Sequence, residues 1–138
     1  MASLPLDART LAALQAVLAS DERVRLALVF GSVARGQTHA TSDLDVAVQG
    51  RNLDLDRLAA DLSQVSDGEV DVVSLDQVGI PLLEEIVRDG VVIYEAGAGT
   101  AAIWRSRALG RLELDRPWYA RMRDAWLRRV AEEGMSRG

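Results

Sequence analysis

The chain has 138 residues, of which 49% are apolar and 27% charged, and this composition favours one globular domain over a disordered chain. A formal charge of −5 argues against direct nucleic-acid binding, and the absence of Cys together with a single His excludes thiol chemistry and histidine-rich metal sites. No signal peptide or apolar run of about 20 residues is recognised, so we expect a cytoplasmic protein without a membrane span.

The spacing of apolar residues predicts the order of the structural elements. A helix and two strands come first, followed by a helix, a strand, a short helix and a last strand. We expect these over residues 7–19, 24–30, 43–48, 55–65, 69–75, 81–88 and 91–94. Asp7 can cap the first helix, and a turn is expected over residues 49–52.

The composition changes at Gly97, which divides the chain into a core of residues 1–96 and a C-terminal helical extension of residues 97–138. Pro117 is expected to break or kink the helix in this extension. Beyond it, aromatic and apolar residues recur at helical spacing among several arginines. The extension either packs back on the sheet or forms a partner-binding surface, because Trp, Tyr and Arg are enriched at interface anchors.

The stretch FGSVARGQTHATSDLDVAV, residues 30–48, holds the strongest candidates for a functional site. Gly31 and Ser32 follow a predicted strand, where backbone amides and a hydroxyl suit the phosphates of a nucleotide. Asp43 and Asp45 project from the same face of the next strand, and neighbouring carboxylates favour a divalent cation. Metal ions held there suit two-metal nucleotidyl transfer, with Mg²⁺ or Mn²⁺ preferred by oxygen ligands.

Asp71 is the third candidate carboxylate. It lies among valines in a predicted strand, where burial of a charge is unfavourable unless something compensates for it. On a strand beside Asp45 it could bind the same metal and accept a proton from an attacking hydroxyl. The alternative is a strand-end aspartate that caps a turn. Glu69 shares its face and is a further candidate, whereas His39 is either a chance surface residue or a nucleotide or partner contact.

Gly31-Ser32, ten intervening residues and Asp43-Leu44-Asp45 resemble the signature of the polymerase-β-like nucleotidyltransferase superfamily, and the longer string resembles its minimal nucleotidyltransferase (MNT) branch. This resemblance implies an α/β (α+β) fold with a mixed sheet of about four strands flanked by helices, followed by a kinked helical tail. Residues 1–96 would then be the catalytic core. The site residues implied are Gly31, Ser32, Arg35 and Ser42 for the nucleotide, and Asp43, Asp45 and Asp71 for catalysis and about two Mg²⁺ or Mn²⁺ ions.

The resemblance also implies a function. Proteins of this branch and size typically pair with a HEPN-type ribonuclease toxin, which they neutralise by transferring AMP from ATP to a tyrosine hydroxyl. We therefore expect a Mg²⁺-dependent protein adenylyltransferase antitoxin that forms a heteromeric complex with such a toxin. Two alternatives remain open: an antitoxin that neutralises by docking through its tail without catalysis, and a nucleotidyltransferase that modifies a small molecule such as an aminoglycoside.

Overall fold

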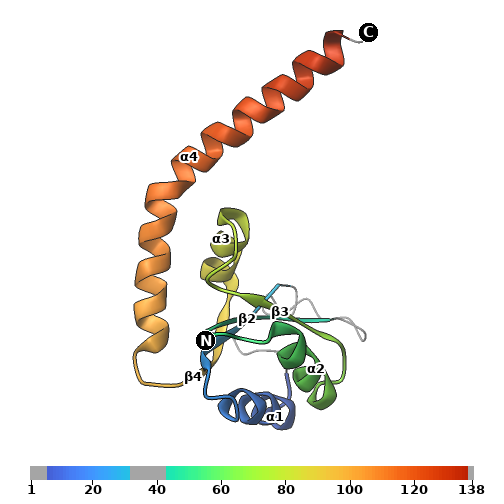
Figure 1. The fold of residues 1–138 in the computed structure, drawn as a ribbon, viewed down its shortest axis with the longest axis vertical. Helices are drawn as coiled ribbons and strands as arrows, with labels where there is room; N and C mark the ends of the chain where they lie inside the picture. The colour runs from blue at the N-terminus through green and yellow to red at the C-terminus, as the bar shows by residue number, and fades with distance from the viewer. Residues whose placement is uncertain (1–5, 32–42, 137–138) are drawn as a thin grey trace.

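A computed structural model describes residues 6–31 and 43–136 of the chain (Figure 1). Its elements follow the expected order of helices and strands. They are α1 (Ala8–Ala19), β1 (Val24–Phe30), β2 (Leu44–Gly50), α2 (Leu55–Val65), β3 (Val70–Ser74), α3 (Ile80–Asp89), β4 (Val91–Glu95) and α4 (Thr100–Ser136).

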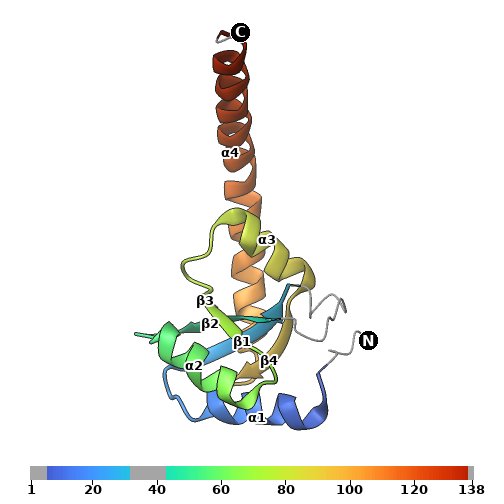
Figure 2. The same ribbon diagram turned by 90° about the vertical axis from the view of Figure 1, so that its right-hand side faces the viewer.

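The four strands form one mixed sheet in the order β3-β2-β1-β4. The central strand β1 is antiparallel to both of its neighbours, whereas β2 and the edge strand β3 are parallel. Helices α1 and α2 cover one face of the sheet, and α3 and the first part of α4 cover the other (Figures 1 and 2). The expected fold, a four-stranded mixed sheet flanked by helices with a helical tail, is confirmed.

Each face of the sheet has its own hydrophobic core, and the alternation of β2 shows which residues belong to which. Val46 packs with the side chains of α1 and α2, whereas Ala47 packs with Leu83 of α3 and Trp104 of α4. Because residues two apart in a strand share a face, Asp45 lies on the same face of the sheet as Ala47. The carboxylate of Asp45 is therefore on the side of the sheet that α3 and α4 cover.

The predicted cap of the first helix is confirmed, and a second helix start is capped in the same way. The Asp7 side chain accepts a 2.6 Å hydrogen bond from the backbone N–H of Thr10, and this bond lowers the pKa of the Asp7 carboxyl. Asp54 caps α2 in the same way, through a 3.1 Å bond from the N–H of Arg57. The predicted turn over residues 49–52 begins later than expected, because β2 continues to Gly50 and pairs there with β1.

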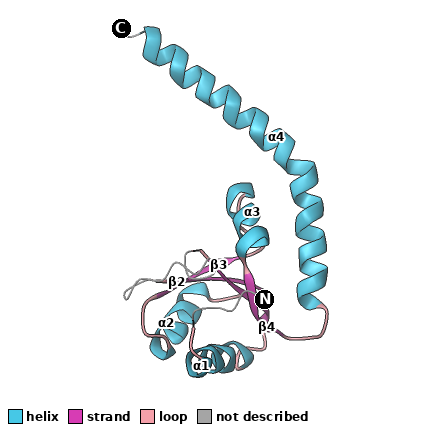
Figure 3. Ribbon diagram, turned by 180° about the vertical axis from the view of Figure 1, so that it is seen from behind, coloured by secondary structure: helices cyan, strands magenta, loops and turns pink. Residues whose placement is uncertain are grey.

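The C-terminal helix is bent and not broken (Figure 3), which is one of the two outcomes predicted for Pro117. Pro117 does not end it: α4 runs continuously from Thr100 to Ser136, although it bends along its course (Figure 3). Its first part packs against α3, whereas its distal part extends away from the rest of the molecule (Figure 1). In the described part of the chain, no helix combines the length and the apolar character that crossing a membrane requires.

Candidate active site

The first structural feature of the site is the turn that ends β1. Gly31 is buried there and has a φ of +80°, a region that residues with a side chain rarely adopt. A Cβ atom added to Gly31 would lie 2.5 Å from Oδ2 of Asp45, so a side chain at this position would force the Asp45 carboxylate to move. The absence of a side chain thus brings the backbone of the predicted phosphate turn directly against a carboxylate of β2.

Strand register brings the second and third candidate carboxylates side by side. Asp45 is paired with Phe30 of β1 on one side and with Asp71 of β3 on the other. Residues paired between neighbouring strands point to the same face of the sheet, so Asp45 and Asp71 lie together next to Gly31. Sequence spacing alone could not establish this pairing, since it does not show which strands are neighbours.

Asp43 and Glu69 extend the acidic edge by one step along the same two strands. The backbone N–H of Leu44 donates a 3.0 Å hydrogen bond to the carbonyl of Glu69, which places Glu69 beside Asp43 at the start of the β2–β3 pair. Both side chains are exposed. The structure therefore keeps Glu69 as a candidate, in the position that strand alternation indicated.

The environment of Asp71 requires a correction. The sequence suggested a carboxylate buried among valines, but Asp71, near the start of the edge strand β3, is exposed. No burial penalty therefore has to be offset at this position. Asp71 is the second residue of β3 and pairs with β2, which disfavours the alternative role of capping a turn. An exposed carboxylate at this edge is accessible to a substrate hydroxyl.

The donor chemistry of this edge fits a hard divalent cation. Carboxylate oxygens are the ligands that Mg²⁺ and Mn²⁺ prefer, and two of them lie on paired residues of neighbouring strands. Among the described residues, no three acidic or histidine side chains already converge as a metal-binding cluster. Asp43, Asp45 and Asp71 as a ligand set therefore remain a prediction. Ser32, Arg35, Ser42 and His39 lie outside the described residues.

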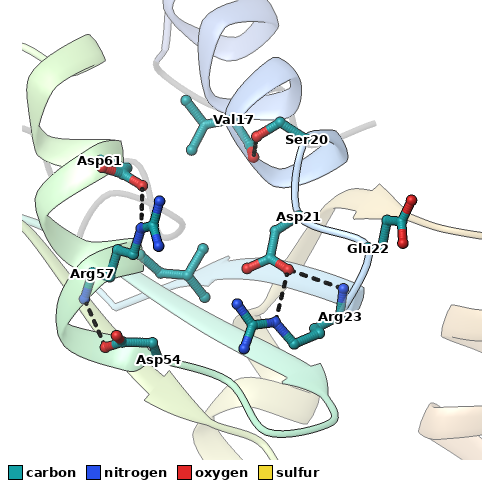
Figure 4. Close-up of a pocket in the computed structure, with 9 residues that line it drawn as sticks. Val17, Ser20, Asp21, Glu22, Arg23, Asp54, Arg57 and Asp61 are labelled. Carbon is teal, nitrogen blue, oxygen red and sulfur yellow. Dashed lines mark hydrogen bonds and ion pairs between the residues drawn. The ribbon is translucent and has the colours of Figure 1, made fainter.

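A hollow of about 330 Å³ lies elsewhere, between the end of α1, the start of β1 and α2 (Figure 4). Its arginines contact nearby carboxylates: Arg23 Nε lies 3.4 Å from Asp21 Oδ1, and Arg57 Nε lies 3.9 Å from Asp61 Oδ2. This hollow is at the beginning of β1, whereas Gly31 follows its end, roughly 23 Å away for a seven-residue strand. We interpret it as a surface groove between elements and not as part of the active site.

Comparisons with known proteins identify the family and the fold. Residues 12–97 match the family model described as polymerase beta, nucleotidyltransferase. MJ0435 of Methanocaldococcus jannaschii, which carries the provisional name protein adenylyltransferase, is 38% identical over 72 residues that cover 49% of this chain and 77% of that protein.

Two solved structures have a similar fold. A chain from a toxin–antitoxin crystal structure with AMP-PNP is 22% identical, with a TM-score of 0.69 and coverage of 84% of this chain and 98% of that chain. A chain from the complex of tri-AMPylated Shewanella oneidensis HEPN toxin with an MNT antitoxin is 20% identical, with a TM-score of 0.66 and coverage of 85% and 96%. At these identities the likeness concerns the fold alone.

Proposed function

Because the chain belongs to the polymerase beta nucleotidyltransferase family and is a nucleotidyltransferase, we propose that it transfers AMP from ATP to a tyrosine hydroxyl of a HEPN-type toxin, as that toxin's antitoxin. The observation that carries the proposal is the pairing of Asp45 with Asp71 next to the Gly31 turn. The proposal assigns the backbone at Gly31 to phosphate binding and the two carboxylates to metal binding, the combination that nucleotidyl transfer requires. The names of the relatives support protein AMP transfer as the specific reaction.

In the proposed reaction, the backbone at Gly31 holds the triphosphate of ATP against the β2–β3 edge. The tyrosine oxygen attacks the α-phosphorus, a new P–O bond forms, and the bond to the β-phosphate breaks with release of pyrophosphate. Asp71 accepts the tyrosine proton, a role that its exposure allows and that contributes roughly 10²–10⁴ in rate.

Asp43, Asp45 and Asp71 are the residues that would hold Mg²⁺ or Mn²⁺. A bound divalent cation neutralises charge on the phosphates and on the leaving pyrophosphate. Asp45 is the best-placed ligand of the three, since it is paired with Asp71 and lies against Gly31. The toxin's ribonuclease activity would be blocked by the added bulk and negative charge of AMP.

The test is intact-mass spectrometry of a HEPN-type partner incubated with this chain, ATP and Mg²⁺. We expect the partner to gain one or more AMP units with the wild-type chain and none with Asp45→Asn or after chelation of divalent cations. Asp56→Asn, which changes an exposed carboxylate at the start of α2, is the matched control and should transfer AMP normally.

The same experiment separates the alternatives. A partner that stays unmodified but is still neutralised, by wild type and Asp45→Asn alike, would replace catalysis with docking as the mechanism. That alternative is favoured by one observation, the exposed distal part of α4. Modification of an aminoglycoside by the isolated chain, with none of the partner, would instead assign a small-molecule acceptor.

A further inference from the structure

The distal part of α4 carries a row of large apolar side chains that the chain itself does not cover. Trp118, Met122, Trp126 and Val130, here called the distal face, recur every four residues. They expose 56%, 52%, 56% and 47% of their surface. Contiguous exposed apolar surface of this kind is typical of interaction sites, and tryptophan is the residue most enriched at binding hot spots.

The distal face continues a row that is buried in the first part of the same helix. Trp104, Ala108 and Leu112 are buried, and Met122, Trp126 and Val130 follow them at an offset of eighteen residues. Eighteen residues are about five helical turns, so an uninterrupted helix would present both rows on one side. The first row is covered by α3 and the sheet, and the second extends beyond them (Figure 1).

The contact between α3 and α4 shows what kind of surface this row accepts. Helix α3 presents apolar side chains to the first row and also carries acidic residues. One of these, Glu84, lies 3.6 Å from Arg116 at the level where α3 stops covering α4. The chain therefore already packs an apolar helix with an acidic flank against α4.

The positive charge of the distal part of α4 also favours an acidic partner. Residues 116–130 contain five arginines and one aspartate, in a chain whose net charge is −5. A second copy of this chain, laid on the distal face, would bring two arginine-rich helical segments together, and like-charge juxtaposition is unfavourable. An acidic partner is favoured, and the apolar character of the row indicates a protein and not a nucleic acid.

A hollow at the elbow of α3 and α4 adjoins this surface. It has a volume of about 300 Å³ and opens where the distal part of α4 leaves α3. Its lining comes from both helices: Ile80, Pro81, Glu84, Arg116, Tyr119 and Arg123. A side chain of a partner helix lying along the distal face can insert here, next to the start of α3.

We propose that the distal face and the elbow hollow form the docking site for an apolar, acid-flanked helix of the protein that this enzyme modifies. The inference rests on the proposed function for the identity of the acceptor, but the surface itself is independent of catalysis. The docking site lies on the same side of the sheet as Asp45. Helix α3 is about 15 Å long and connects the elbow hollow to β4. Val91 of β4 pairs with Val29, the residue before Phe30, and Phe30 pairs with Asp45.

This arrangement explains how a small chain can position a large acceptor. The partner is held by α4 and its hydroxyl is presented at the edge of the sheet, roughly one short helix away. Loss of the distal face should therefore raise the KM for the protein acceptor and leave kcat and ATP binding unchanged.

The test uses the full-length chain, its double variant Met122→Gln/Trp126→Gln, and a co-expressed and purified HEPN-type partner. Glutamine retains helix propensity while it removes the apolar surface. The matched control, Ala131→Gln, changes the opposite side of the same helix without altering its charge. We expect the face variant to weaken partner binding at least about tenfold by calorimetry, the effect of losing an aromatic anchor, and the control to bind as wild type does.

The possible outcomes distinguish failure of the docking site from failure of the proposed function. Normal partner binding by the face variant overturns the docking site, whatever the state of catalysis. If the wild-type chain transfers no AMP but partner binding still depends on the distal face, the proposed function is rejected and the proposed docking site stands. A face-dependent dimer in analytical ultracentrifugation, or face-dependent binding of a single-stranded RNA in place of the protein, assigns the surface to a different occupant and overturns the proposal.

Discussion

The two halves of α4 have the same apolar spacing and opposite environments. Trp104 in the first half exposes 6% of its surface, whereas Trp126 in the second half exposes 56%. The difference comes from the rest of the fold, because α3 and the sheet reach the first row and end before the second. A periodic apolar row thus predicts that a helix has a face to bury, but it does not identify the surface that buries it.

We expect the largest difference between the two halves in the stability effects of two tryptophan substitutions. Trp104→Ala removes a large side chain from the core and should lower the free energy of unfolding by about 3–5 kcal/mol. Trp126→Ala changes an exposed side chain and should stay within about 0.5 kcal/mol of wild type. Urea denaturation followed by circular dichroism measures both.

The outcome has a direct meaning for the fold. A large loss from Trp126→Ala in the isolated chain would show that the distal half is already packed in solution, against another copy or against the body. In that case both apolar rows would contribute to the free energy of unfolding, and the distal face would not be available to a partner.

The sequence predicted the elements well because their signals are local. Apolar spacing and the Asp7 cap both act within a few residues of the chain. The identity of the candidate site was also local, since Gly31 and Asp45 belong to one motif. What spacing could not supply was the pairing of β2 with β3, which brings Asp71 to Asp45 from far along the chain.

The error at Asp71 has its origin in long-range structure. Asp71 was expected to be buried because valines surround it in sequence, but it lies near the start of an edge strand and is exposed. Pro117 was expected to break or kink the tail, and the helix bends without a break (Figure 3). Proline removes one backbone hydrogen bond and distorts the turn before it, which a long helix can absorb by bending.

A second prediction concerns the boundary between the halves. Pro117→Ala restores the missing hydrogen-bond donor and should stabilise the middle of α4 locally, by up to about 3 kcal/mol on propensity. Because the distal half is largely independent of the core, we expect slower amide hydrogen exchange over residues 113–125 and little change in global stability. The partner Kd should rise if the bend orients the distal face.

The control for this prediction is Ala125→Ser, a mild change in helix propensity on the same segment without any effect on the bend. Unchanged hydrogen exchange in Pro117→Ala would show that the bend is set by contacts with α3 and not by the proline. The packing of the first half of α4 against α3 would then determine the orientation of the distal face.

The smallest effect is expected from the ion pair at the elbow. Arg116 and Glu84 lie 3.6 Å apart, and about half of each side chain is exposed, so the pair should contribute only about 0.2–1 kcal/mol at low salt. A double-mutant cycle of Glu84→Gln and Arg116→Gln measures this coupling, which should fall as salt screens it. Its size in the isolated chain reports how firmly α3 holds the start of the distal half.

The same cycle repeated with the partner bound extends the comparison. A partner helix at the elbow excludes water from the pair, and charges interact more strongly when they are less exposed to solvent. The coupling should therefore increase on binding if the partner covers the elbow, and it should stay the same if the partner contacts only the far end of α4. An unchanged coupling with intact dependence on Trp126 would move the docking site away from α3 and weaken the link between docking and the catalytic edge.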